Sequence, residues 1–399
     1  MPMNHHASPG FFTLRLQQPF DTSLFIAVAL LVGLGLVMVA SASIGIADSK
    51  YHNPLHFILR QSIYVALGAG FGWMMYHIPL RFWETAGLVL LPVSFLLLVV
   101  VLIPGVGKTV NGATRWVMLG PFSLQPSEFV KLLMVLYTAS YIVRHGEALR
   151  GTLTGFIKPL LVVGATTALL LLEPDFGAAA VILLVTMGML FVGGVRFLQF
   201  IGLFAAVAAV FAVLAITSPY RMQRLTSFLD PWQDPYNTGF QLTQSLIAIG
   251  SGSWDGVGLG SSVQKLAYLP EAHNDFMFAI LAEELGLIGV FVVLLLFVYA
   301  VLRSFSIGAR AERIGHYFGA YVAYGIGLWL GIQAFVNIGV NMGVLPTKGL
   351  TLPFMSAGGS SMLAMCAAVG VLLRVHSEIH ALEQKGIRSR SRKDKGAGK

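Results

Sequence analysis

Long apolar runs, separated by short breaks that carry polar residues, Gly or Pro, dominate the pattern along the chain. A hydrocarbon core of roughly 30 Å needs about 20 mainly apolar residues per helix. Applied to each run, this length predicts an all-α integral membrane protein, a bundle of about ten transmembrane helices. The predicted spans lie near residues 24–44, 57–77, 82–103, 127–144, 156–172, 176–193, 197–217, 276–302, 316–341 and 353–375.

The basic residues between the runs predict the orientation of the bundle, because cytoplasmic loops retain Lys and Arg. Of the 26 Lys and Arg residues, seventeen lie on the side of the N-terminus, seven lie on the other side, and Arg60 and Lys131 fall within spans. We therefore expect both termini to be cytoplasmic. The predicted organisation is an N-terminal segment (1–23), a membrane domain (24–375) and a basic tail (376–399).

Two loops on the outer side are too long to be simple connectors. The first runs from Pro104 to Pro126, and the second, residues 218–275, joins spans 7 and 8. Long loops in compact proteins usually carry function. Within the second loop, residues 241–249 are semi-apolar and are expected to form an amphipathic helix at the membrane interface.

Composition supports the membrane assignment, with 56% hydrophobic and 11% charged residues. The net charge of +8 comes largely from the tail, and a basic juxtamembrane segment more often faces anionic lipid than nucleic acid. Cys366 is the only cysteine, so an intramolecular disulfide is excluded. Residues 1–18 lack the pattern of a cleaved signal sequence.

Ionisable groups within spans require a partner or a function. Glu128 and Lys131 open the fourth span at a spacing that places them on one helix face, where they can pair. One interpretation is a structural strut between helices. The other is a cationic pocket of Arg60, Arg115 and Lys131 at the outer leaflet, suited to a diphosphate. The sequence pattern leaves both open.

A carboxylate, Asp275, stands where the second outer loop meets the eighth span. Asn274 and Asp275 would serve as helix-capping residues. Alternatively, Asp275 is a general base, with His273 and Glu271 beside it, that takes a proton from a hydroxyl group. Two deeper carboxylates, Glu283 and Glu284, require tertiary partners or a polar cavity.

Two other segments favour structural roles. Residues 173–177 predict a helix hairpin between spans 5 and 6, and the small residues of 354–361 predict close packing. The sequence contains no Walker loop, dinucleotide fingerprint, nucleophile elbow or His/Cys metal cluster.

Six motifs taken together resemble the SEDS family (shape, elongation, division and sporulation), in order along the whole membrane region. They are Asn111–Trp116, Gln125–Lys131, Glu173–Gly177, Gln241–Gly250, Leu269–Phe276 and Pro353–Ser361. The extended N-terminus, the basic tail and Asp230–Tyr236 favour the cell-division branch of that family over the elongation branch.

The resemblance implies a peptidoglycan glycosyltransferase that polymerises lipid II at the outer face of the bacterial inner membrane. It implies a class B penicillin-binding protein transpeptidase as partner, other division proteins nearby, and a septal location. By motif, Asp275 is the expected catalytic carboxylate. The expected substrate-binding residues are Arg60, Arg115, Glu128, Lys131 and His273, of which Arg60 is the looser assignment.

The expected mechanism inverts the anomeric centre: a sugar hydroxyl attacks, Asp275 takes its proton, and the cations stabilise the departing diphosphate. A retaining mechanism would need a second carboxylate close by, for which Glu271 is a candidate. No cofactor is predicted, although a divalent cation could also screen the diphosphate. The competing hypotheses are a lipid II flippase, which needs charged groups near the midplane, and a non-catalytic division scaffold.

Overall fold

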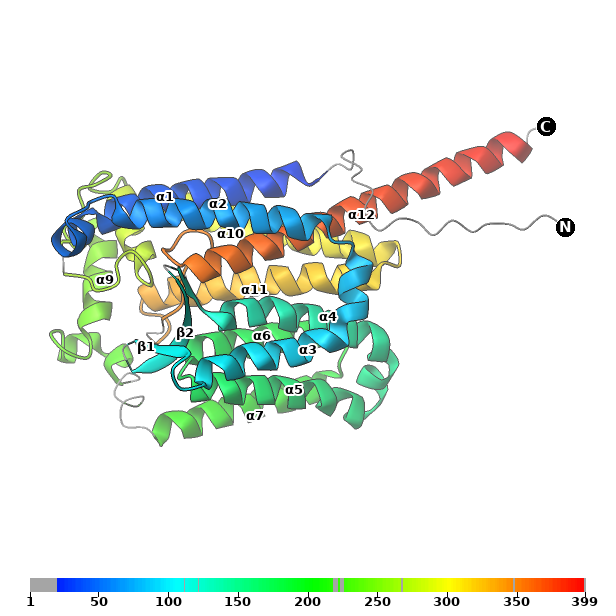
Figure 1. The fold of residues 1–399 in the computed structure, drawn as a ribbon, viewed down its shortest axis with the longest axis horizontal. Coiled ribbons are helices and arrows are strands. Elements are labelled where there is room, and N and C mark those ends of the chain that lie inside the picture. The colour runs from blue at the N-terminus through cyan, green and yellow to red at the C-terminus, as the bar shows by residue number, and fades with distance from the viewer. Residues whose placement is uncertain are drawn as a thin grey trace.

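The computed structural model describes residues 20–397, apart from 111, 121, 218–221, 223–225, 267 and 347–348. Within them, ten long helices occupy the ten predicted spans, which confirms the predicted fold class (Figure 1). Six of these described helices, α1, α3, α5, α10, α11 and α12, are long and apolar enough to cross a membrane. The bounds are α1 (Thr22–Tyr51), α2 (His56–His77), α3 (Leu80–Leu102), α4 (Pro126–Gly151), α5 (Leu153–Leu172), α6 (Phe176–Val192), α7 (Phe197–Ile216), α10 (Met277–Arg313), α11 (Tyr317–Asn341) and α12 (Gly359–Ala397).

The start of α1 and the end of α12 lie at the same end of the bundle (Figure 1). Asp21, the N-cap of α1, accepts a hydrogen bond from Nε of Arg303 at 2.6 Å, and its carboxylate lies 3.4 Å from Nδ1 of His376. These contacts join α1, α10 and α12 at that end. The outer loops gather at the opposite end, which is the side predicted to face outwards.

The first outer loop forms a small antiparallel sheet, which the sequence pattern did not predict. Its strands are β1 (Gly107–Val110), β2 (Ala113–Leu119) and β3 (Phe122–Leu124), in the order β1-β2-β3. Lys108 pairs with Trp116 and Thr109 pairs with Thr114, so Arg115 is the extra residue of a β-bulge. Bulges redirect side chains and are frequent beside active sites.

The second outer loop contains the predicted short helix, α9 (Phe240–Ser251), and a short 3₁₀ turn, Pro231–Gln233. Beyond α9 the loop turns back against α10, which is broken at Gly286, where φ is 62° and ψ is −165°. The amide groups of Val257 and Gly258 donate to the carbonyl groups of Glu283 and Glu284. The loop thereby satisfies carbonyl groups that the helix break leaves unpaired.

The carboxylates of Glu283 and Glu284, both buried, have the tertiary partners that the sequence required. Glu283 accepts hydrogen bonds from Oγ of Ser262 and from the amide of Val263. Glu284 accepts from Oγ of Ser41 and pairs with Nζ of Lys265 at 2.7 Å. These bonds fix the loop and α1 to the first half of α10.

The segment before α12 is not helical, whereas the sequence pattern predicted a helix from residue 353. Phe354 has a φ of 64°, and the side chains of Leu352, Phe354, Met355 and Ser356 are buried. The amide of Ala357 donates to the carbonyl of His273, and Nε2 of Gln61 donates to that of Ser356. This segment therefore packs inside the outer end of the bundle.

Some sequence predictions fall on residues outside the described part of the chain. These are residues 1–19 of the predicted N-terminal segment, and Asn111, Arg221, Arg224 and Lys348. The predicted boundary at residue 375 lies inside α12, which continues unbroken into the tail.

Candidate active site

Asp275 lies in the turn that immediately precedes α10, at the outer end of the bundle. It does not cap that helix, because the N-cap residue is Phe276 and no side chain of the turn caps it. The capping interpretation was therefore wrong. Within the described residues, the half-buried carboxylate of Asp275 makes no hydrogen bond.

Two asparagines of α11 hold the Asp275 backbone in place. Nδ2 of Asn337 and Nδ2 of Asn341 each donate to the carbonyl oxygen of Asp275 at 2.9 Å. Oδ1 of Asn341 also accepts the amide of Ala279 at 3.2 Å, so a residue of α11 satisfies the first turn of α10. The position of Asp275 is therefore set jointly by α10 and α11.

The environment of Asp275 suits a general base. Burial raises the pKa of Asp275 to about 7, the negative charge of Glu271 adds to this rise, and Arg115 opposes it. A base with a pKa near the working pH combines a useful ionised fraction with a strong drive to accept a proton. Glu271 itself is exposed and accepts a hydrogen bond from Nδ2 of Asn274.

Arg115 is the predicted cation whose charge acts on Asp275. From the bulge in β2, its Nε donates to the carbonyl of Glu173 at 3.4 Å, and Nη2 donates to that of Pro174. It therefore links the sheet to the turn between α5 and α6. In that turn Asp175 caps α6 through the amide of Ala178, as the predicted hairpin requires.

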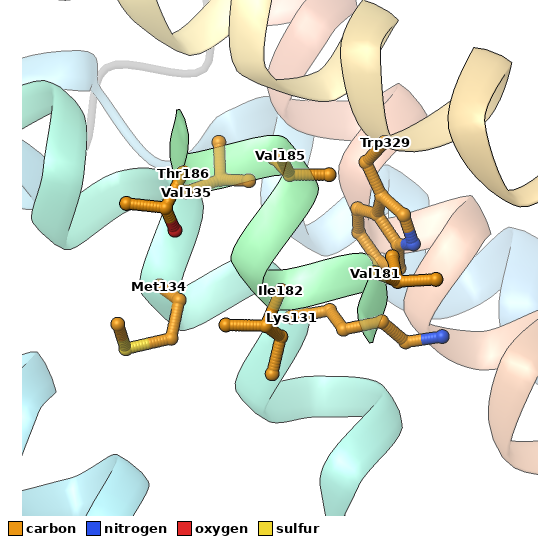
Figure 2. Close-up of a pocket in the computed structure, with 8 residues that line it drawn as sticks. All are labelled: Lys131, Met134, Val135, Val181, Ile182, Val185, Thr186 and Trp329. Atoms are coloured by element: carbon orange, nitrogen blue, oxygen red, sulfur yellow. The ribbon is translucent and has the colours of Figure 1, made fainter. Parts of the chain in front are cut away.

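Lys131 is buried within the bundle rather than free in an outer pocket. Its Nζ donates to Oε1 of Glu128 and to Oε1 of Gln333, both at 2.8 Å. Its stem borders a cavity of about 10 Å³, and its amino end extends toward Trp329 (Figure 2). This cavity has room for about one water molecule and not for a diphosphate. Together with the two contacts of Nζ inside the bundle, it favours the strut interpretation of the Glu128–Lys131 pair.

Arg60 contacts strand β3, and His273, two residues before Asp275, packs against α2. Nη2 of Arg60 donates to Oγ of Ser123 in β3 at 3.1 Å, and its guanidinium lies over the ring of Tyr64. The His273 ring is buried and lies 4.5 Å from the ring of Phe57, centroid to centroid. Burial lowers the pKa of His273, so its imidazole is neutral at pH 7.

Arg60, Arg115 and Lys131 thus bond to different elements rather than lining one cationic pocket. Gln333 joins Lys131 to the segment before α12: it accepts from Lys131 and donates to the carbonyl of Thr351. Gly349 precedes Thr351 by two residues, and a Cβ added at Gly349 would lie 3.0 Å from Oδ2 of Asp275. Within the described residues, no group of three or more His, Cys, Asp or Glu side chains is placed to hold a metal ion.

Asn337 and Asn341 were not predicted as site residues, because their side chains are not ionisable. A signal was present: Gln333, Asn337 and Asn341 recur every four residues in an otherwise mostly apolar helix. That spacing puts three amides on one face, where they require partners.

A model of the family that groups FtsW, RodA and SpoVE, described as a cell cycle protein, matches residues 21–381. The chain belongs to this family. It is the SEDS family that the six motifs resemble. One SEDS relative, from Thioalkalivibrio sulfidiphilus, carries the name "Probable peptidoglycan glycosyltransferase FtsW"; it is 60% identical over 365 residues, which cover 92% of this chain and 91% of the relative.

Solved structures of SEDS proteins match as well. A structure titled "Structural coordination of polymerization and crosslinking by a peptidoglycan synthase complex" includes a chain that is 31% identical, with a TM-score of 0.72, covering 90% of this chain and 98% of that one. The crystal structure of the rod shape determining protein RodA from Thermus thermophilus is 30% identical, with a TM-score of 0.66 and the same coverage. Both confirm the multi-pass helical fold.

Proposed function

We propose that this SEDS protein is a peptidoglycan glycosyltransferase of the cell-division branch, which polymerises lipid II at the outer face of the inner membrane. The observation that carries the proposal is the carboxylate of Asp275: within the described residues it has no hydrogen bond, two asparagines hold its backbone carbonyl, and Arg115 opposes the rise of its pKa. The names of the relatives support the same activity.

In the proposed mechanism Asp275 accepts the proton of the acceptor sugar hydroxyl. The hydroxyl oxygen forms a bond to the anomeric carbon of the donor, and the bond from that carbon to the diphosphate breaks. The lipid diphosphate departs with the bonding electron pair, and Arg115 stabilises its charge. Attack from the face opposite the diphosphate inverts the anomeric centre.

The proposal extends to the assembly and its location. The partner is a class B penicillin-binding protein transpeptidase, consistent with the solved synthase complex, and other division proteins complete the assembly. The protein is multi-pass in the inner membrane with both termini cytoplasmic, and it acts at the septum. The domain organisation proposed is residues 1–23, 24–375 and 376–399, with the large outer loop at 218–275.

The test is Asp275→Asn, assayed as glycan polymer formed from lipid II by the purified complex with its transpeptidase partner. The amide keeps the size of the side chain and removes its basic oxygen, so we expect turnover to fall roughly 100-fold or more. Thermal unfolding and partner binding should match the unmodified protein. Near-normal polymer from Asp275→Asn would instead favour the flippase or scaffold hypothesis.

A further inference from the structure

Glu173 carries a buried carboxyl group to which the mechanism above gives no role. It ends α5 in the outer turn before α6, and its side chain is fully buried. Within the described residues, neither carboxyl oxygen has a hydrogen-bond partner. An ionised carboxylate so placed would lack both water and a bonded cation, which is strongly unfavourable.

The charged groups around Glu173 do not supply that missing partner. The nearby Arg115 bonds to the backbone carbonyls of the turn and not to the carboxyl. Asp175 adds a negative charge, and its own oxygens accept from Ser127, Gln125 and the amide of Ala178. The packed helices α3, α6 and α11 carry no charged residue in their outer halves, and on α4 Glu128 and Lys131 pair with each other.

Burial and the charge of Asp175 therefore raise the pKa of Glu173 to about 8, against the opposing effect of Arg115. At neutral pH the group is a neutral carboxylic acid with an O–H that is not engaged. Such a group donates a hydrogen bond where a carboxylate only accepts one.

The turn that carries Glu173 borders the same part of the site as Asp275. Arg115 acts electrostatically on both carboxyl groups. The segment at residues 349–350 approaches both: a Cβ added at Gly349 would lie 3.0 Å from Oδ2 of Asp275, and one added at Gly177, four residues after Glu173, would lie 2.9 Å from Leu350. The turn that carries Glu173 and the Asp275 carboxyl thus border one short segment, and both carboxyl groups are affected by one arginine.

We propose that Glu173, as a neutral acid, donates its O–H to the diphosphate of the lipid-linked donor, beside Arg115. This inference rests on the proposed function, because the diphosphate is that of the donor substrate. The proton stays on Glu173 throughout, and no covalent bond to this residue forms or breaks. Since the carboxyl group has no hydrogen-bond partner among the described residues, turning it towards a bound diphosphate breaks none of the hydrogen bonds seen there.

The role predicts an upper pH limit for substrate binding. Above a pH of about 8 Glu173 ionises, loses its donor and repels the diphosphate, so affinity for lipid II should fall as pH rises. Glu173→Gln keeps a donor of similar shape that cannot ionise. Glu173→Met keeps the volume and removes the donor.

The experiment measures binding of fluorescently labelled lipid II to the purified complex in lipid nanodiscs between pH 6 and pH 9.5. Glu173→Gln should bind as the unmodified protein does at pH 7 and should retain that affinity above pH 8. Glu173→Met should bind about tenfold more weakly at pH 7, the loss expected for one hydrogen bond to a charged group. The matched control is Glu147→Gln, which makes the same change at an exposed position near the C-terminal end of α4.

A second measurement does not depend on substrate. The infrared carbonyl band of a protonated carboxylic acid is recorded in Asp275→Asn, because Asp275 also has a raised pKa, of about 7. In that protein the band should disappear with a midpoint near pH 8, and it should be missing when Glu173→Gln is added. A midpoint near the ordinary value of 4.5 would overturn the inference, as would a Glu173→Gln variant that keeps the alkaline loss of affinity. If Glu173→Met does not fold, the Glu173→Gln data and the infrared band decide.

The two proposals fail separately. If the unmodified complex polymerises lipid II and both Glu173 variants bind it identically, the inference is wrong and the glycosyltransferase proposal stands. If the complex binds lipid II with the predicted pH dependence and forms no polymer, the diphosphate site stands and the glycosyltransferase proposal is wrong.

Discussion

Asp275 and the residues that hold it set the pH response of the site. The residue must be ionised to accept a proton, and burial raises its pKa to about 7. We therefore expect kcat/KM for polymerisation to fall about tenfold per pH unit below that value. The profile should be measured with lipid II in saturating and limiting concentrations. Full activity maintained down to pH 5 would exclude Asp275 as the base.

Asn341 is expected to position Asp275 without touching the substrate. Asn341→Leu removes one of the two donors to the Asp275 carbonyl, which keeps Asn337. It also removes one of the two acceptors of the Ala279 amide, which keeps the carbonyl of Phe276. Each lost hydrogen bond should cost about 0.5–1.5 kcal/mol. Asn341→Asp keeps the acceptor alone. Its carboxylate would be fully buried and would face the carbonyl oxygens of Asp275 and Asn337, so the stability of Asn341→Asp should fall below that of Asn341→Leu in thermal unfolding.

Turnover provides the second readout for Asn341. Both variants lose one donor to the Asp275 carbonyl, so both should lower kcat more than they raise KM. Unchanged kcat in a folded Asn341→Leu protein would show that α11 does not position the base.

At the scale of elements, the break in α10 depends on one glycine. Gly286 has a φ of 62°, and an added Cβ would lie 2.3 Å from the amide nitrogen of Gly256. Gly286→Ala should therefore lower the free energy of unfolding by about 1–3 kcal/mol, because alanine is strained in this glycine-only conformation. The clash of its Cβ with the backbone should lower it further. The measurement is thermal unfolding in nanodiscs.

Gly202→Ala serves as the control for Gly286→Ala, because it makes the same change in helix α7, where an added Cβ meets nothing within 4 Å. It should be neutral or slightly stabilising. Equal effects of the two substitutions would mean that the break in α10 does not need a glycine.

The helices could be predicted from sequence wherever the length of an apolar run alone determines the span. All ten spans were found in this way, because the membrane imposes a length on each helix. The break at Gly286 could not be predicted, since apolar residues continue on both sides and the loop that satisfies its carbonyls comes from residues 253–258. The late start of α12 depends similarly on tertiary contacts of Ser356 and Ala357.

The candidate residues could be chosen from the sequence, but their arrangement could not be predicted. Asp275, Arg115 and Lys131 were found from motifs and from the rarity of charges in spans. The common pocket was not found in the structure, because Lys131 bonds to Gln333 in a helix some 200 positions later, and no local pattern reveals that partner. The bulge that directs Arg115 likewise depends on strand register.

At the scale of the whole molecule, the basic residues predict the topology. Reporter fusions after Val143 and after Lys399 should both indicate the cytoplasm, and a fusion at Trp232 should indicate the outside. A fusion within α6 at Val185 serves as a control for membrane insertion. A cytoplasmic signal at Trp232 would place Asp275 on the wrong side for lipid-linked sugars at the outer face and remove the catalytic proposal.

Helix α12 is longer than the hydrocarbon core of a membrane is thick. Its 39 residues at about 1.5 Å each extend for nearly 60 Å, about twice the hydrocarbon thickness. Near its outer end Oγ of Ser360 accepts the amide of Gln125, directly before α4, and its other end carries the basic tail. Because no break interrupts the described helix, a movement of the tail along the helix axis would also move Ser360 and its contact with Gln125.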